Sequence, residues 1–319
     1  MNPPQRLYPS CVAIMGPTGS GKSQLALTLA ERIDGEIVSC DSMQVYRGMD
    51  VGTAKPSRET LRRVPHHLID VVDIHEPYNL NRFLRDASEA IRAITERRKN
   101  VVLCGGTGLY IRALISGYEL QPADKAVARA VLQEYQEPGG EQALRKELEH
   151  YDAELARSLT NPRHLMRAVE IVRITARAPP KSGRPVDPAQ HRHIYQYVLV
   201  PEPERHREWI RTRTYRMFRS GWIEEVRFLL QNGWLRTPTA RQALGYRSVA
   251  GFLFSGNETL KALQARISAE TWKYVRRQRT WFRNQHPEAE AVKLEKATDV
   301  SSAGDKIVNG LEKFKPAER

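Results

Sequence analysis

The stretch CVAIMGPTGSGKSQLALTLAERI, residues 11–33, decides the fold. Its first five residues form a short apolar run, which predicts a buried parallel strand. In the second half, Leu25, Leu29 and Ile33 recur at the four-residue spacing of an amphipathic helix. The residues between them fit the pattern G-x-x-x-x-G-K-[ST], in the strand-to-helix context that this motif requires. The stretch therefore predicts a phosphate-binding loop at the edge of a parallel sheet.

The residue types of this loop suit a phosphorylated ligand. Glycines let backbone N–H groups approach phosphate oxygens, and the N-terminus of the following helix adds a partial positive charge. Lys22 would neutralise the outer phosphate, and the Ser23 hydroxyl can hold Mg²⁺, the expected cofactor. The residues expected to bind the diphosphate or nucleotide are Gly16, Pro17, Thr18, Gly19, Ser20, Gly21, Lys22 and Ser23.

The first 118 residues alternate apolar runs with a helical pattern. Runs at 36–40, 67–72 and 101–104 predict three more strands, and residues 80–98 carry apolar side chains at helical spacing. Strands that alternate with helices indicate a parallel sheet covered on both faces. We therefore predict an α/β fold, with a P-loop-type parallel sheet flanked by helices and an all-helical insertion domain.

The insertion is expected at residues 119–194, which contain no strand-like run. Three of its segments have the periodicity of helices: 124–136, 141–159 and 162–177. A stretch rich in Pro, Gly and charge, 178–191, predicts a loop, and the apolar run 194–200 predicts a return to the sheet. The catalytic core would then comprise residues 1–118 and 195–319, the latter mostly helical and basic. Its tail is charged, with one short helical pattern.

Composition narrows the class of protein. No apolar run reaches the roughly 18 residues of a membrane span, and the N-terminus lacks the apolar stretch of a secretion signal. The three cysteines have no CxxC spacing and each ends an apolar run, so we interpret them as small core residues in a reducing cytosol. A structural zinc site is not expected. We predict a cytoplasmic protein, without membrane contact and monomeric.

The positive charge is concentrated in one part of the chain. The formal net charge is +13, and between Arg205 and Arg283 there are 17 Lys and Arg against 5 Asp and Glu. Such a cluster is typical of a protein with a polyanionic partner such as nucleic acid. The alternative is a soluble, helix-rich basic surface.

The carboxylates near the loop favour chemistry other than nucleotide hydrolysis. An ATPase or kinase usually has a metal-binding Asp at a strand end, but the run 101–104 is followed by Gly105, Gly106 and Thr107. The acid that does follow a predicted strand is Asp41, at the edge where α/β proteins bind ligands. Asp41 is a candidate base aimed at a nucleophile, and the alternative is a helix N-cap.

Six motifs occur in this order along the chain: GPTGSGKS, DSMQVYRGMDVGTAKP, VPHHLID, GGTGLY, LGYRSV and VRRQRTWFR. Together they resemble the tRNA dimethylallyltransferase family, also called tRNA isopentenyltransferases, over about residues 11–285. The resemblance implies transfer of a five-carbon group from dimethylallyl diphosphate to the exocyclic amine of the adenine just 3′ of the anticodon. The phosphate loop would then hold the diphosphate of this donor rather than an ATP to be hydrolysed.

The resemblance also implies roles for single residues. Asp41 would accept or orient the proton of the adenine amine, Thr107 would lie beside the diphosphate and the amine, and Arg213 would stabilise the leaving diphosphate. The insertion would clamp the anticodon loop around a flipped-out base. The residues expected to contact tRNA are Asp41, Ser42, Met43, Gln44, Thr107, Arg129, Arg167, Arg247, Arg276 and Arg277. Arg247, Ser248 and His164 depart from residues frequent in the family.

Two other enzyme classes and one binding class stay open at this point. A small-molecule kinase with this loop would turn over ATP, but it leaves the basic segment unexplained. A transferase that prenylates free AMP, ADP or ATP needs neither a basic clamp nor an insertion. An RNA-binding protein without activity would not need Asp41 and Thr107 beside a phosphate loop.

Overall fold

The computed structural model describes residues 11–116, 121–179, 194–296 and 299–313. The chain forms two compact units, which are described separately: Met1–Ile115 together with Ala189–Arg319, and Ser116–Pro188. Most of the predicted loop at 178–191 lies outside the described residues. None of the helices in the described ranges is both long and apolar enough to cross a membrane.

The first unit is built on a six-stranded parallel sheet with the strand order β3-β2-β4-β1-β5-β6. The strands are β1 (Cys11–Met15), β2 (Gly35–Ser39), β3 (His66–His67), β4 (Asn100–Gly105), β5 (Ile194–Pro201) and β6 (Glu290–Leu294). The predicted α/β class is confirmed. Because β1 is central, paired with β4 and β5, the loop that follows it lies at the middle of the sheet edge.

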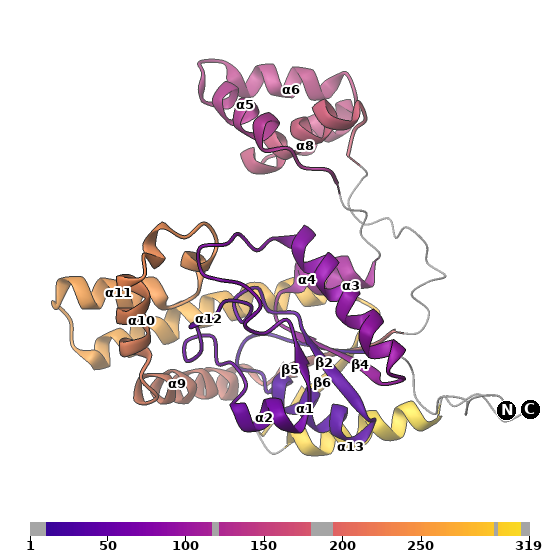
Figure 1. The fold of residues 1–319 in the computed structure, drawn as a ribbon, viewed down its shortest axis with the longest axis vertical. Helices are drawn as coiled ribbons and strands as arrows, with labels where there is room; N and C mark the ends of the chain where they lie inside the picture. The colour runs from indigo at the N-terminus through magenta and orange to yellow at the C-terminus, as the bar shows by residue number, and fades with distance from the viewer. Residues whose placement is uncertain (1–10, 117–120, 180–193, 297–298, 314–319) are drawn as a thin grey trace, which may run out of the picture. The chain divides into compact units, whose positions relative to one another are not determined.

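Helices cover both faces of this sheet, as the alternation along β1 requires. Val12 and Ile14 are buried with α1 (Lys22–Arg32) and α13 (Asp299–Lys313). Ala13 and Met15 are buried on the opposite face with α3 (Leu80–Glu96) and α4 (Gly108–Ile115). Figure 1 shows these two helix layers on either side of the strands. Cys40 and Cys104 are buried, and burial raises the pKa of the Cys104 thiol to about 11, as expected of core residues.

The predicted strand at 67–72 is wrong over most of its length. Only His66 and His67 pair with β2, and Val72 makes a single bridge to Tyr46. The backbone of Leu68 has φ 63° and that of Asp70 has φ 55°, both in the left-handed region that no strand tolerates. Leu68 and Val72 are buried all the same, because this loop packs against the main core, whereas Ile69 and Val71 are only partly buried.

The second half of the first unit is helical. Its helices are α9 (Pro203–Arg219), α10 (Trp222–Gln231), η2 (Trp234–Arg236), η3 (Ala240–Gln242), α11 (Tyr246–Ser255) and α12 (Leu260–Gln285). A further short helix, α2 (Arg58–Arg63), lies earlier in the chain, between β2 and β3. The long helix α12 packs against α9 and carries the motif VRRQRTWFR. The strand β6 was not predicted, because four of its five residues are at least partly exposed and two of the five are charged, so it contains no continuous apolar run.

The second unit contains four helices within residues 121–179. They are α5 (Lys125–Gln136), α6 (Gly140–Glu149), α7 (Ala153–Ser158) and α8 (Pro162–Thr175). Residues 141–159, predicted as one helix, are two, because Asp152 leaves helical geometry and its side chain caps α7 at Leu155. Small apolar side chains such as Val131, Leu144 and Val169 form a core of their own.

Candidate active site

The loop between β1 and α1 has the geometry of an anion cradle. Gly19 and Gly21 have φ 74° and 90°, and Gly21 precedes α1 without any side-chain cap. The first N–H groups of α1 therefore have no side-chain acceptor and point toward the space at the helix start. A side chain at Gly16 would place its Cβ 2.9 Å from the Ser20 hydroxyl, so the tight turn needs glycine.

Two cations that form no ion pair with a described residue face this cradle. Lys22 and Arg213, from α1 and α9, are both half-buried, and neither makes an ion pair with another described residue. Burial lowers the pKa of both side chains, and the carboxylate of Asp41 partly opposes this shift. Half-buried cations without a partner favour the binding of an anion, which would restore the electrostatic balance that desolvation removes.

Two cavities meet at these cations. The larger has a volume of about 740 Å³ and is lined by residues 18–24 of the phosphate loop and by apolar side chains such as Ile37 and Leu61. The smaller, of about 280 Å³, is lined by Thr107 and by Tyr274 and Arg277 of α12. The residues that line both cavities are Thr18, Lys22, Asp41, Thr53, Arg213 and Met217. Ligands held in the two cavities would therefore meet at Asp41.

Asp41 is held so that one of its oxygens is available. Its Oδ1 accepts hydrogen bonds from the N–H groups of Met43 and Gln44, at 2.8 and 3.3 Å. Oδ2 makes no hydrogen bond to any described residue. The alternative of a helix N-cap is not realised, because a turn and no helix follows Asp41: Oδ1 caps this turn, while Oδ2 can accept a proton.

Thr107 bonds to both chain neighbours of Asp41, and its position beside the diphosphate and the amine stays a prediction. Its Oγ1 accepts a hydrogen bond of 3.1 Å from the Ser42 N–H, and its own N–H donates to the Cys40 carbonyl. These bonds join the end of β4 to the end of β2, which are adjacent in the sheet. Asp41, Ser42, Met43 and Thr107 all line the smaller cavity.

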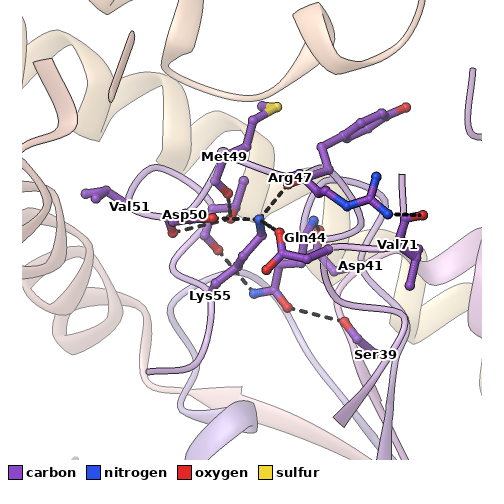
Figure 2. A network of polar contacts seen from close by, with 12 residues as sticks. Ser39, Asp41, Gln44, Arg47, Met49, Asp50, Val51, Lys55 and Val71 are labelled. Atoms are coloured by element: carbon purple, nitrogen blue, oxygen red, sulfur yellow. Dashed lines mark hydrogen bonds and ion pairs between the residues drawn. The ribbon is translucent and has the colours of Figure 1, made fainter. Parts of the chain in front are cut away.

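Gln44 is engaged within its own loop. Its Nε2 donates to the carbonyls of Thr53 and Ala54, at 3.2 and 3.3 Å, and its Oε1 accepts from the Ser39 hydroxyl. The same loop is cross-linked by Lys55, whose buried amine donates to Asp50, Asp70 and the Tyr46 carbonyl. Figure 2 shows Lys55 and Gln44 at the centre of this network. In this structure Gln44 shapes the wall of the larger cavity, and its contact with tRNA stays a prediction.

Glu225 of α10 fixes the same wall from outside. Its carboxylate accepts hydrogen bonds from the N–H groups of Asp50, Val51 and Gly52, at 2.7, 2.6 and 3.2 Å. The Tyr246 hydroxyl donates to the other side of this carboxylate at 2.7 Å. No pattern in the sequence marks Glu225, because its partners are backbone groups far away along the chain.

Gln278 is a second residue that the sequence analysis missed. Its side chain is buried, its Oε1 accepts from the Thr18 N–H at 2.9 Å, and its Nε2 donates to the Gly106 carbonyl at 2.8 Å. One amide on α12 therefore ties the phosphate loop to the turn that carries Thr107. The one feature of the sequence that could have pointed to Gln278 is that it is a neutral amide among the arginines of VRRQRTWFR.

His206 supports the loop from α9. It is fully buried, and its Nε2–H donates to the Thr18 carbonyl at 2.9 Å, while Nδ1 has no partner among the described residues. Burial lowers the pKa of His206 to about 4, and that of His286 likewise to about 4. The neutral ring is therefore the form that the fold accommodates.

Acidification should destabilise the fold through these two histidines. The unfolded chain binds their protons near pH 6.5, so the free energy of unfolding should fall as the pH falls from about 6.5 to 4. The variant His206→Gln retains an N–H donor for Thr18 but does not titrate. Its free energy of unfolding should therefore fall less steeply with falling pH than that of the wild type, by up to about 1.4 kcal/mol per pH unit. Denaturant unfolding across this range measures both slopes, and parallel profiles would contradict the assignment.

The arginines predicted to contact tRNA differ in how free they are. Arg276 and Arg277 on α12 are exposed and make no ion pair with described residues. Arg247 donates to the carbonyl of Arg241. In the second unit, Arg129 donates to the carbonyl one turn back in its own helix, and Arg167 pairs with Glu170. Contact of these five arginines with RNA stays a prediction.

A phosphate loop at the centre of a parallel sheet edge defines a P-loop-type α/β protein with an anion site. The family model for IPP transferase matches residues 44–285. The tRNA dimethylallyltransferase of Thermus thermophilus is 43% identical over 278 residues, which cover 85% of this chain and 89% of the relative. That of Kocuria rhizophila is 40% identical over 274 residues, 85% of each chain.

Solved structures agree with the sequence relatives. The crystal structure of the full-length tRNA isopentenylpyrophosphate transferase from Bacillus halodurans has a TM-score of 0.67 and 33% identity, covering 95% of this chain and 97% of that one. A eukaryotic dimethylallyltransferase acting on tRNA has a TM-score of 0.79 at 23% identity, covering 97% and 81%, and shows the same fold. The chain belongs to the IPP transferase family, and the resemblance carried by the six motifs is confirmed.

Proposed function

We propose that this chain transfers the dimethylallyl group of dimethylallyl diphosphate to the exocyclic amine of the adenine just 3′ of the anticodon in tRNA, releasing diphosphate. The observation that carries the proposal is the position of Asp41, on the wall shared by a phosphate-loop cavity and a second cavity. The names of the relatives, which are tRNA dimethylallyltransferases, support the choice of donor and acceptor.

The donor fits the larger cavity. Its diphosphate would lie on the N–H groups of the phosphate loop, with Lys22 and Arg213 beside the oxygen that leaves. As the allylic C–O bond breaks, the diphosphate takes the electron pair, and preorganised cations stabilise the developing charge. No carboxylate follows β4, where Gly105, Gly106 and Thr107 stand, so the arrangement favours a diphosphate leaving group over metal-assisted attack on a triphosphate.

The acceptor adenine would enter through the smaller cavity. Its amine nitrogen forms the new C–N bond, and the proton that it loses goes to Oδ2 of Asp41. Thr107, one hydrogen bond away from Ser42, lies on the same wall and would orient the amine. The base has to leave its stack to reach this point, as in other enzymes that act on a base.

Magnesium would be held mainly by the substrate. Within the described residues no three His, Cys, Asp or Glu side chains gather as metal ligands, and the protein oxygen that we assign to the ion is the Ser23 hydroxyl at the start of α1. This donor set fits Mg²⁺, which commonly takes one or two protein oxygens and completes its shell with phosphates and water. When bound there, Mg²⁺ would neutralise part of the diphosphate charge.

The remaining parts of the proposal concern tRNA binding and assembly. The helical unit, with Arg129 and Arg167, would clamp the anticodon loop, and Arg247, Arg276 and Arg277 would contact the RNA. One chain supplies every residue assigned to the reaction, so a monomer is sufficient for activity. Without an apolar span in the described helices, we assign the protein to the cytoplasm, where its tRNA substrate is found.

Labelled dimethylallyl diphosphate, incubated with unmodified tRNA or with AMP, tests the function. We expect label in the tRNA and none in the AMP. Label in AMP alone would instead make the protein a free-nucleotide prenyltransferase. ATP turnover that depends on an acceptor alcohol, without any prenyl transfer, would make it a kinase.

Binding of tRNA should depend on salt through Arg276 and Arg277. Phosphate contacts release counterions, so log affinity should fall linearly with log salt, by about 0.7–0.9 per neutralised phosphate. Replacing both arginines by alanine should flatten the slope by about one to two units. Arg62→Ala with Arg92→Ala removes the same charge from α2 and α3 and should leave the slope unchanged. If the wild type and both double variants had the same salt slope, Arg276 and Arg277 would be solvent-exposed residues without phosphate contacts.

A further inference from the structure

Trp281 is an exposed indole in the C-terminal half of α12, where Val275 and Phe282 are buried. Its exposed fraction is 37%, whereas Trp222 and Trp234 in the neighbouring helices are almost fully buried. Trp281 makes no ring–ring or cation–π contact with any described residue. The ring is therefore free to stack on a group brought by a partner.

The indole lies next to the catalytic turn. A Cβ added to Gly108 would come within 2.2 Å of two atoms of the Trp281 ring, so the ring packs directly on the backbone that follows Thr107. On α12, Trp281 is one turn beyond Arg277 and Gln278, which line the smaller cavity. The ring is therefore at the outer edge of the cavity assigned to the acceptor.

Three cations line the same groove as this ring. A groove of about 660 Å³ outside the cavity is lined by Lys273, Arg276, Arg277, Thr280, Trp281 and Asn284, among others. Its three cations make no ion pair with described residues, and Arg277 lines both this groove and the smaller cavity. An aromatic face between unpaired cations is the combination that binds single-stranded nucleic acid, with bases on the ring and phosphates on the cations.

We propose that Trp281 stacks on a base of the anticodon loop next to the adenine that is modified. The inference rests on the proposed function, because flipping the target adenine exposes the faces of its neighbours, and an aromatic ring at the cavity edge can cover one of them. A protein partner fits less well, since it would have to bring acidic groups for three cations around one indole. A stacked base makes Trp281 a binding residue that favours the flipped state.

The test is a double-mutant cycle between protein and RNA. Wild-type protein and Trp281→Ala are titrated with an anticodon stem-loop RNA, and with two variants that lack the base 5′ or 3′ of the target adenine. With intact RNA, Trp281→Ala should weaken binding by about 5- to 150-fold. With one of the two abasic RNAs the substitution should have almost no further effect, because the stacking partner is gone.

Two further variants separate stacking from support of the turn. Trp281→Leu keeps an apolar cover over Gly108 but has no ring, so binding should stay weak, whereas Trp281→Phe should recover most of it. Phe228→Ala removes an exposed aromatic residue that lines none of the three cavities and should bind like wild type. Full binding by Trp281→Leu would overturn the proposal. So would independent effects, in which Trp281→Ala weakens the binding of both abasic RNAs by the same factor as that of the intact RNA. Absence of prenyl transfer to intact RNA by wild type would instead refute the proposed function.

Discussion

Replacing Asp41 by asparagine should slow the prenyl-transfer step by roughly 10²–10⁴-fold, the range typical of a positioned general base. Asparagine retains an Oδ1 that accepts from the N–H groups of Met43 and Gln44, so the turn after β2 should stay in place. What disappears is the charge on Oδ2, and with it the group that takes the proton from the adenine amine. Single-turnover transfer with saturating tRNA and donor measures this step apart from binding.

Asp41→Ala provides the complementary variant. It removes both the base and the turn bonds, so its rate should be at most that of the asparagine variant, while tRNA affinity should change little in either. A near-normal single-turnover rate for Asp41→Asn would show that Asp41 only caps the turn. Because Oδ1 alone has hydrogen-bond partners among the described residues and Oδ2 is left for the proton, the two substitutions distinguish these roles.

The second large effect is expected at the two unpaired cations. Replacing Lys22 by methionine or Arg213 by alanine should each lower kcat by about 10²–10³-fold, similar to the loss of one oxyanion donor. The reason is that charge develops on the diphosphate only as the C–O bond breaks, so a cation beside it stabilises the transition state more than the bound donor. Methionine keeps the length and apolar character of the lysine stem.

Controls for this prediction lie in the same cavity. Arg213→Lys should restore activity only partly, because one ammonium cannot replace the planar, bidentate guanidinium. Arg216→Ala removes an exposed cation that also lines the larger cavity, and its effect should be much smaller. Wild-type kinetics for the donor in either Lys22→Met or Arg213→Ala would exclude that residue from stabilising the leaving group.

The sequence predicted those parts of the fold in which consecutive residues of a strand are buried. The strands β1, β2 and β4 are short runs buried almost throughout, and β5 is an apolar run buried at its centre, which is why they stand out in the sequence. The edge positions were different. The run 67–72 belongs to a loop that packs apolar side chains into the core, so its apolar pattern does not mark a strand. Strand β6 is largely exposed, so it lacks the buried apolar pattern that marks the other strands.

The site was predictable where a motif carries the chemistry. The phosphate loop places Lys22 at the start of α1, and Asp41, Thr107 and Arg213 lie with it around the two cavities. The supporting residues were not predictable in the same way. Gln278, His206 and Glu225 act through backbone groups far along the chain, and no local spacing encodes such contacts.

The most direct test of the central claim is a comparison of two tRNA transcripts that differ by one amino group. One carries adenine just 3′ of the anticodon, and the other carries unsubstituted purine at that position, which lacks the exocyclic amine. We expect label from dimethylallyl diphosphate only in the first transcript, recovered after digestion as N6-dimethylallyladenosine. Equal labelling of the purine transcript, or label recovered from another nucleoside, would contradict the assignment of the amine as the acceptor.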